Sequence, residues 1–403
     1  MRLRSVAATN FLAIREAKIA LGDVTLVASG NWQGKTSIQQ AVRMALTGEP
    51  ARVRLKKEYE MLIHEGQKKA EFEVVVAGGK GGDATLSCSI TSSARKGMPN
   101  PDDIGDPLKC ALDPYRFVLA DEAGRRRILT QLARGEIDGK AIAERFGKAG
   151  LPQANIDAVL PLFASGWAGF DAAAAHAQTE ASTLKAAWKA ATGETWGKEK
   201  AEDWHPKEIP APAAMTCPEC GSDLYLAGTA TLTSAPPTAA QLEAGAQAKA
   251  KEIHAGIKEW LRLAELVATD SPSGIPSDLL APTIAAVNER LSWSAQITKW
   301  PQAAIRPDMS VTVNGRLLGL CSEAETWCAA AMLAEAIGRA ADINFVMLDR
   351  MDVLGPEHRP EAIVWARMVA AEGGQALIFA TLKEKPAMDG VTVFWLEAGR
   401  VKE

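Results

Sequence analysis

The feature that most constrains this chain is a strand, loop and helix pattern near its start. An apolar run at Val24–Ala28 leads into the loop SGNWQGKTS at residues 29–37, and an amphipathic run starts at Ile38. In a loop of this form, backbone amides and a helix N-terminus bind phosphates, a lysine reaches the β- and γ-phosphates, and the next hydroxyl binds Mg²⁺. The pattern therefore predicts a phosphate-binding P-loop; the alternative is a glycine-containing turn with an exposed lysine.

The loop departs from the P-loop pattern at its first position. Ser29 stands where the pattern expects glycine. Serine tolerates a tight turn less readily than glycine, but its backbone amide still donates a hydrogen bond. Lys35 is therefore still expected to reach the phosphates, and Thr36 the metal. The predicted nucleotide-binding residues of the loop are Asn31, Gly34, Lys35, Thr36 and Ser37.

Composition narrows the class of protein. The 403 residues, 47% of them hydrophobic and 23% charged, are typical of a soluble globular chain with two or three domains. Six cysteines are too few for a disulfide framework, and Met1–Val6 leads into a strand instead of an apolar signal region. No apolar run approaches the ~20 residues that span a bilayer. We therefore expect a cytoplasmic protein without membrane contact.

The net charge says little about whether the chain binds nucleic acid. A formal charge of -4 gives no overall basic surface, so any contact with DNA must come from a local patch. The segment from Arg52 to Lys69 is rich in lysine and arginine. It is either a solvated face or a contact for the DNA backbone.

Short strands and turns surround the loop. Strands are predicted at Leu3–Ala8 and Ala17–Leu21, before the strand that leads into the P-loop. Runs at Glu71–Val76 and Ala84–Ile90 flank a glycine-rich turn and predict a hairpin. Farther along, residues 116–133 predict a short strand or turn that leads into a helix.

The middle of the chain is predicted to be helical. Phe170–Ala191 and Ala239–Val267 are rich in residues that favour helices, although Gly245 and Gly256 weaken the second prediction. At about 1.5 Å per residue, helices of roughly 20 to 30 residues are ~30 to 45 Å long. A proline-flanked CPEC motif at residues 217–220 lies between them. The pattern predicts an arm of two helices with a Cys-x-x-Cys tip.

Two features near the C-terminus complete the pattern. Ser322 and Glu325 form a capping box before an apolar-rich helix at Thr326–Ala340, which taken alone marks only a helix start. A buried strand at Ile343–Leu348 then leads to Asp349, the position of a Mg²⁺-organising carboxylate near a P-loop. Further strands are predicted at Ala376–Thr381 and Val391–Leu396.

This order of motifs resembles the zinc-hook ATPases of the SMC superfamily, with the nearest likeness to the bacterial SbcC type of DNA-repair ATPase in a short, phage-type form. The resemblance covers essentially the whole chain by layout but only a few motifs by residue. It implies an α/β fold, an ABC/SMC-type P-loop ATPase head assembled from N- and C-terminal lobes, with an inserted helical, coiled-coil arm. The implied domains are the N-terminal lobe at residues 1–165, the arm at 166–274 and the C-terminal lobe at 275–403.

The resemblance also assigns roles to single residues. Lys35 and Thr36 match the Walker A phosphate and Mg²⁺ residues, and Asp349 matches the Walker B aspartate. Ser322 matches the serine of the family's signature motif, which would contact the γ-phosphate bound on the opposite subunit. The implied catalytic residues are Lys35, Asp349 and Ser322, and the implied cofactors are ATP and Mg²⁺, with Thr36 and Asp349 as metal ligands. The implied assembly is a homodimer whose heads close on ATP and act on DNA or on a partner nuclease.

The chain also departs from the family pattern. Arg350 stands where the family has a glutamate after the Walker B aspartate, and Leu382 stands where it has a switch histidine. Trp32 replaces a glycine of the P-loop, and Glu323-Ala324 replaces small residues of the signature motif. The family's glutamine-containing loop has no recognisable match.

These departures leave the enzymatic activity open. A positioned proton-transfer group contributes ~10²- to 10⁴-fold, so its loss predicts slow ATP hydrolysis unless Asp352, Glu323 or Glu325 takes its place. Two other interpretations compete with a weak ATPase. One is a non-hydrolysing, nucleotide-dependent scaffold that recruits or regulates another protein, and the other is a zinc-bridged structural dimer that needs no ATP.

The Cys-x-x-Cys pair has three interpretations. A structural zinc takes four ligands in a tetrahedron, and Cys217 and Cys220 supply two. Two chains that meet tip to tip would complete an inter-chain zinc site, which the resemblance favours. The alternatives are a vestigial knuckle and a reduced thiol pair. The other cysteines, Cys88, Cys110, Cys321 and Cys328, are expected to be core or incidental residues.

Overall fold

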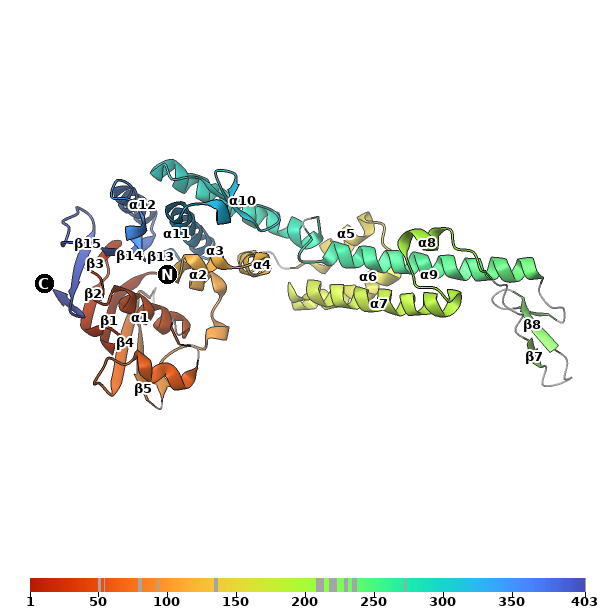
Figure 1. The fold of residues 1–403 in the computed structure, drawn as a ribbon, viewed down its shortest axis with the longest axis horizontal. Coiled ribbons are helices and arrows are strands. Elements are labelled where there is room, and N and C mark those ends of the chain that lie inside the picture. Colours follow the sequence, from red (N-terminus) through yellow and green to blue (C-terminus); the bar gives the residue numbers. More distant parts are fainter. Residues whose placement is uncertain are drawn as a thin grey trace. The chain divides into compact units, whose positions relative to one another are not determined.

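The N- and C-terminal parts of the chain fold together. The computed structural model describes residues 1–49, 52–53, 55–78, 82–92, 94–133, 137–207, 214–216, 223–227, 231–233, 238–271 and 273–402. Met1–Arg134 and Leu280–Glu403 form one unit, which we call the head, and Gly135–Leu279 forms a second unit, which we call the arm (Figure 1). The head is therefore assembled from both ends of the sequence.

A ten-stranded mixed sheet runs through the head in the order β13-β14-β3-β15-β16-β2-β1-β4-β5-β6. Strand β3 lies between β14 and β15, so the strand before the P-loop is held between two strands from the other end of the chain. The N-terminal strands are β1 (Leu3–Phe11), β2 (Ile14–Ala20), β3 (Val24–Ser29), β4 (Lys69–Val76), β5 (Ala84–Thr91) and β6 (Arg95–Lys96). The C-terminal strands are β13 (Phe345–Leu348), β14 (Gln375–Thr381), β15 (Thr392–Glu397) and β16 (Arg400–Lys402).

Four neighbouring strands of the sheet, β13, β14, β3 and β15, run parallel. Thr381 at the end of β14 pairs with Ser29 at the end of β3. Because parallel strands end at the same edge of a sheet, the segments that follow Ser29, Leu348 and Thr381 start beside one another. All residues of β3 and β13 are buried, as expected for strands covered on both faces.

The other end of the sheet is antiparallel, from β2 through β1, β4 and β5 to β6. Phe11 of β1 and Phe72 of β4 lie with their ring centroids 5.0 Å apart. Both belong to a core that includes Val42 of helix α1 (Lys35–Thr47). The helix that follows the P-loop therefore packs on this part of the sheet.

Apart from α10 (Ile275–Thr298) and α11 (Glu323–Ala340), the other helices of the head are short. Helix α11 is buried continuously from Trp327 to Gly338, and its many alanines allow close packing against α2, α3 and β13. A small sheet of β10 (Ala303–Ile305), β11 (Val311–Val313) and β12 (Arg316–Leu317) precedes it. The helices are α2 (Asp106–Leu112), α3 (Tyr115–Leu119), α4 (Glu122–Thr130), α10 (Ile275–Thr298), α11 (Glu323–Ala340) and α12 (Arg359–Ala371).

Two segments differ from the sequence prediction. Residues 115–119 form helix α3 and not a strand or turn. Helix α10, which leads from the arm into the head, has no counterpart among the predicted helices because its sequence contains Pro276 and Pro282. Proline is tolerated in a first turn, where its missing N–H would have no partner, but Pro282 lies inside the helix.

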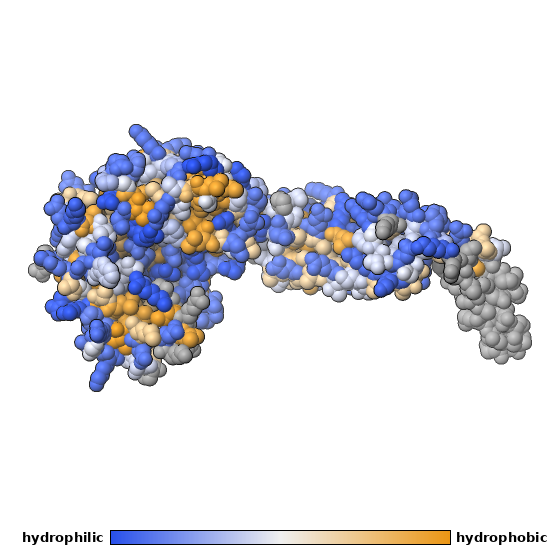
Figure 2. Space-filling view, in the orientation of Figure 1, coloured by the Kyte–Doolittle hydropathy of each residue, from blue (hydrophilic) through white to orange (hydrophobic). Residues whose placement is uncertain are grey.

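Two long helices build the arm (Figure 1). Helices α7 (Ala168–Thr192) and α9 (Ala239–Val267) confirm the helices predicted from composition. They are antiparallel, because Phe170 near the start of α7 packs in one cluster with Leu263 near the end of α9, and Trp188 packs against the middle of α9. Hydrophilic residues cover much of the arm's visible surface (Figure 2). The shorter helices are α5 (Gly139–Lys148), α6 (Gln153–Val159) and α8 (Lys198–Glu202).

Between α8 and α9 the structure describes three short strands, β7 (Ala214–Thr216), β8 (Asp223–Ala227) and β9 (Thr231–Thr233), which pair antiparallel. Cys217 and Cys220 lie outside the described residues, so the zinc site stays a prediction. Over the described ranges, no helix has both the length and the apolar character needed to cross a membrane.

Candidate nucleotide-binding site

The predicted P-loop connects the end of β3 to the start of α1. Gly34 is the N-cap of α1 and has a φ of 104°, in the region that favours glycine. A Cβ at this position would lie 2.5 Å from Cδ1 of Ile14, the first residue of β2. Only glycine therefore fits here without a shift of Ile14, and the free amides of the first turn of α1 face the loop.

Lys35 is almost fully buried at the start of α1, with 9% of its surface exposed. Its Nζ donates to the carbonyl oxygens of Gly30 at 2.8 Å and Ser29 at 3.3 Å, and to the Ser29 hydroxyl at 3.2 Å. Burial lowers the pKa of the Lys35 ammonium, an effect opposed by the carboxylates of Asp352 and Asp349. Ser29, the departure from the pattern, therefore gives this lysine an additional acceptor.

Asp349 follows directly on β13 and lies near Lys35. Burial raises the pKa of its carboxyl group, while the backbone N–H of Arg350, which donates to Asp349 Oδ1 at 2.8 Å, opposes this shift. The Asp349 backbone carbonyl accepts from the indole N–H of Trp327 at 2.7 Å, which fixes the strand end against α11. A carboxylate held in such an environment gains stability from a nearby cation.

A cavity of about 450 Å³ brings the predicted residues together. The P-loop and the segment after β13 form its walls, so the oxygens of Thr36 and Asp349 face the same space. Hydroxyl and carboxylate oxygens are ligands that Mg²⁺ accepts, and the amides at the N-terminus of α1 can bind a phosphate. The residues therefore fit a Mg²⁺-nucleotide. The predicted residues that line the cavity are Asn31, Gly34, Lys35, Thr36, Ser37 and Asp349.

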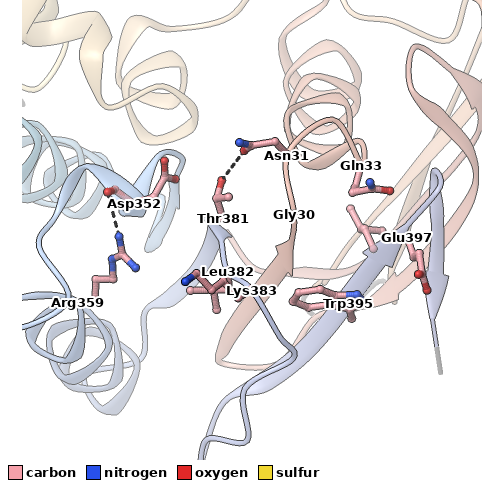
Figure 3. A pocket seen from close by; sticks show the side chains of 11 residues that line it. Gly30, Asn31, Gln33, Asp352, Arg359, Thr381, Leu382, Lys383, Trp395 and Glu397 are labelled. Carbon is pink, nitrogen blue, oxygen red and sulfur yellow. Dashed lines mark hydrogen bonds between the residues drawn. The ribbon is translucent and has the colours of Figure 1, made fainter.

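A second cavity of about 730 Å³ adjoins the first and shares Asn31, Asp352 and Thr381 with it. Figure 3 shows Thr381 facing Asn31, with Asp352 on one side and Trp395 on the other. The Thr381 hydroxyl donates to Asn31 Oδ1 at 3.4 Å, which ties the P-loop to the end of β14. The P-loop is thus held by the neighbouring strand as well as by its own.

Ser322 does not line the cavity that contains Lys35. It is the exposed N-cap of α11, and its hydroxyl accepts from the Glu325 amide at 3.2 Å. Glu325 in turn accepts from the Ser322 amide at 2.8 Å, which confirms the predicted capping box. One chain alone therefore does not bring the predicted signature serine to the P-loop.

The carboxylates suggested as a replacement for the missing glutamate differ in their surroundings. Glu325 is engaged in the capping box and in an ion pair with Arg316, and Glu323 forms an ion pair with Arg350. Asp352 lines both cavities, and within the described part of the chain its carboxylate has no hydrogen bond or ion pair. Asp352 is therefore the carboxylate best placed to act near a bound nucleotide.

Comparison with solved structures identifies the fold. The Smc head domain with a coiled coil and joint from Pyrococcus yayanosii matches with a TM-score of 0.53 at 12% identity, over 100% of this chain and 96% of that chain. The Smc head domain with an extended coiled coil bound to the C-terminal domain of ScpA, from Pyrococcus furiosus, matches with a TM-score of 0.50 at 12% identity, over 100% and 95%. No protein-family model and no curated protein matches the sequence.

The fold is that of an SMC head domain. At this identity the likeness concerns the fold alone. Together with the sheet order it confirms the predicted α/β class and the head assembled from two lobes with a helical arm. The roles of single residues stay predictions.

Two residues that line the site, Tyr115 and Arg52, were not predicted as site residues from the sequence. Tyr115 and Arg52 line a third cavity of about 260 Å³ that shares Thr36, Asp349 and Arg350 with the first. The Tyr115 hydroxyl is buried and has no hydrogen-bond partner in the part of the chain that the structure describes. Burial raises the pKa of this phenol. The only signal in the sequence was an aromatic residue after Pro114, which points to no particular chemistry.

Three of the four cysteines that the structure describes, Cys88, Cys110 and Cys328, are buried core residues. Burial raises the pKa of the Cys88 thiol to about 11 and those of Cys110 and Cys328 to about 12. Cys321 is partly exposed beside Ser322, and burial raises its pKa as well. Over the described ranges, no three His, Cys, Asp or Glu side chains are grouped so as to hold a metal. Cys217 and Cys220 lie outside these ranges.

Proposed function

We propose that this chain is an ATP-binding, SMC-like ATPase of the DNA repair and recombination type. The observation that carries the proposal is the convergence of Lys35 and Thr36, at the start of α1, with Asp349, at the end of β13, on one cavity. These three side chains come from opposite ends of the sequence. A lysine, a hydroxyl and a carboxylate at the carboxyl ends of parallel strands form a phosphate and Mg²⁺ site.

The site residues have distinct tasks in this proposal. Lys35 exchanges the carbonyl oxygens of Ser29 and Gly30 for phosphate oxygens, and the amides at the start of α1 bind the same phosphates. Thr36 and Asp349 hold Mg²⁺, which when bound neutralises phosphate charge. Asp352 lines the cavity and is the candidate to orient a water molecule. Because Arg350 replaces the usual glutamate, we expect slow hydrolysis.

The proposed assembly is a homodimer that forms around nucleotide. Ser322 lies outside the cavity of its own chain, which supports a role for it at the phosphate held by a second chain. The heads would close on ATP and act on DNA or on a partner nuclease. The finer likeness to the SbcC type in a short phage form, with Zn²⁺ shared between chains by Cys217 and Cys220, belongs to this proposal.

Binding and turnover of ATP test the proposal directly. Purified full-length protein is titrated with Mg²⁺-ATP, and phosphate release is measured with and without double-stranded and single-stranded DNA. Lys35→Ala is expected to abolish binding, whereas Lys18→Ala, an exposed lysine on β2, should have no effect. Wild-type protein that binds no nucleotide would refute the proposal.

A nucleotide-dependent scaffold without hydrolysis is the second candidate. The observation that favours it is Arg350, whose guanidinium pairs with Glu323 at the position where a carboxylate would be needed. In this case Mg²⁺-ATP binds and induces dimers, but no phosphate is released with any DNA. Phosphate release that disappears in Lys35→Ala would exclude the scaffold.

A further inference from the structure

Arg350 occupies a position that links the nucleotide cavity to α11. It follows directly on Asp349 and lines both the cavity that contains Lys35 and the smaller cavity that contains Tyr115. Its φ is 61°, a left-handed conformation that is uncommon for a residue with a side chain. The sharp turn at Arg350 ends β13 and starts the short 3-10 helix Met351–Val353.

The guanidinium of Arg350 is paired with a carboxylate that can be exchanged. It donates to Glu323, the first residue of α11 and the neighbour of Ser322. The side chains of Arg350 and Glu323 are 54% and 64% exposed, and exposed ion pairs contribute little to stability. A stronger anion in the cavity would therefore compete successfully for this arginine.

The surroundings of Arg350 favour a phosphate as that anion. Lys35 and Arg52 line the same cavity, so three cations border one space. Arginine can form two parallel hydrogen bonds with either a carboxylate or a phosphate, but a terminal phosphate carries more negative charge than one carboxylate. Thr36 and Asp349, the proposed metal ligands, line both cavities together with Arg350, so Arg350 would be close to the metal when a nucleotide is bound.

We propose that Arg350 is a triphosphate sensor, which releases Glu323 and binds the terminal phosphate of a nucleoside triphosphate in its own chain. The proposal rests on the proposed nucleotide binding and adds a switch to it. When Arg350 leaves Glu323, the first turn of α11 loses this ion pair, while Trp327 still holds the helix to the Asp349 carbonyl and the capping box of Ser322 and Glu325 stays in place. The turn that carries the exposed Ser322 then has one contact fewer with its own chain.

Paired titrations with Mg²⁺-ATP and Mg²⁺-ADP test this proposal. We expect Arg350→Ala to weaken ATP binding about tenfold or more, and ADP binding less than about twofold, because only ATP supplies the terminal phosphate. Glu323→Gln removes the competing carboxylate, so it should tighten ATP binding about two- to fivefold without affecting ADP binding.

Arg316→Ala is the matched control. Arg316 is also 54% exposed and pairs with Glu325 in the same first turn of α11, but it lines none of the three cavities described above. It should leave both affinities unchanged. Arg350→Gln, which keeps most of the side chain, serves as a second variant if Arg350→Ala does not fold.

The outcomes separate this inference from the proposed function. Equal losses of ATP and ADP affinity in Arg350→Ala would overturn the sensor, as would wild-type affinities in that variant or weaker ATP binding in Glu323→Gln. In each of these cases wild-type protein still binds ATP through Lys35, so the proposed function stands. Wild-type protein that binds neither nucleotide overturns both.

Discussion

At the scale of single residues, the P-loop carries two side chains where the pattern expects glycine, and they are accommodated in different ways. The hydroxyl of Ser29 accepts a hydrogen bond from Lys35, so the substitution adds a contact. Trp32 has a φ of 67°, and 93% of its surface is exposed. It therefore carries a left-handed backbone without burying its side chain.

Replacing Trp32 by glycine is expected to stabilise the protein. The left-handed conformation costs roughly 1–2 kcal/mol for a residue with a Cβ, and glycine avoids this cost. Little burial is lost, because the indole is exposed. We expect Trp32→Gly to raise the free energy of unfolding by about 1 kcal/mol in denaturant titrations. Trp32→Ala keeps the Cβ and should give no such gain; an equal gain in both variants would contradict the strain argument.

The charged carboxylate of Asp349 is expected to lower the free energy of unfolding at neutral pH. Its folded-state pKa is raised above the ordinary 3.8, so the native state binds this proton more tightly than the unfolded state. The free energy of unfolding therefore falls as pH rises from the ordinary value through the raised one. Asp349→Asn removes this loss, and its amide oxygen can still accept from the Arg350 N–H.

We therefore expect Asp349→Asn to raise the melting temperature at pH 7 while Mg²⁺-dependent ATP binding is lost. Calorimetry at pH 7 and at pH values below 4 measures the first effect, and the gain should shrink as the wild-type carboxyl becomes protonated. Asp389→Asn, on the exposed loop before β15, is the control. A variant that is destabilised at pH 7 would show that the carboxylate has a structural role.

Sequence patterns located the phosphate and metal residues because Asp349 directly follows a predicted strand, and Lys35 and Thr36 lie where a strand, a loop and a helix follow one another. Asp349 and Lys35 meet in the structure because β13 and β3 are parallel strands of one sheet. The pair of Arg350 and Glu323 was not predictable, since it depends on how α11 packs against the end of β13. Tyr115 was missed because it begins a helix of only five residues, which leaves no periodic pattern.

At the scale of elements, composition and periodicity predicted most of the structure. The strands around the P-loop, the hairpin of β4 and β5, and the helices α7, α9 and α11 appear within a few residues of the expected bounds. Helix α10 was not predicted, because it contains a proline at position 282 that its packing overrides. The order of strands in a sheet depends on tertiary contacts. The position of β3 between β14 and β15 could therefore not be predicted from local sequence patterns.

The two glycines of α9 allow a matched test of helix propensity in the arm. Gly245 is exposed, and a Cβ there would meet no atom within 4 Å. Gly245→Ala should therefore stabilise the arm by about 0.5–1 kcal/mol. At Gly256 a Cβ would lie 3.0 Å from Leu184 Cδ1 of α7, so Gly256→Ala should gain less. Thermal unfolding measures both, and equal gains would show that Leu184 moves aside freely.

At the scale of the whole molecule, the proposed dimer assigns Ser322 to the site of the partner chain. Lys35, Thr36 and Asp349 share a cavity, but Ser322 is exposed at the start of α11. In a two-fold dimer each nucleotide would lie between the P-loop of one chain and the Ser322 of the other. Mixtures of two variants test this arrangement.

Mixing two variants that each fail to form ATP-bound dimers is expected to restore such dimers. Lys35→Ala lacks the phosphate lysine, and Ser322→Asn lacks the hydroxyl but keeps a good N-cap. In a mixed dimer one site carries both lesions and the other carries neither. After equal mixing with random exchange, about a quarter of the wild-type number of ATP molecules should be held in the dimer fraction. Sedimentation with labelled ATP measures this fraction.

Mixing Lys35→Ala with Asp349→Asn is the control, because both lesions act in the chain that holds the nucleotide. Each site of that mixed dimer has one lesion, so no ATP-bound dimers should return. Recovery in the first mixture but not in the second is the result that a shared site requires. If neither mixture recovers, Ser322 acts within its own chain or only as a cap, and nucleotide-driven pairing through this serine is wrong.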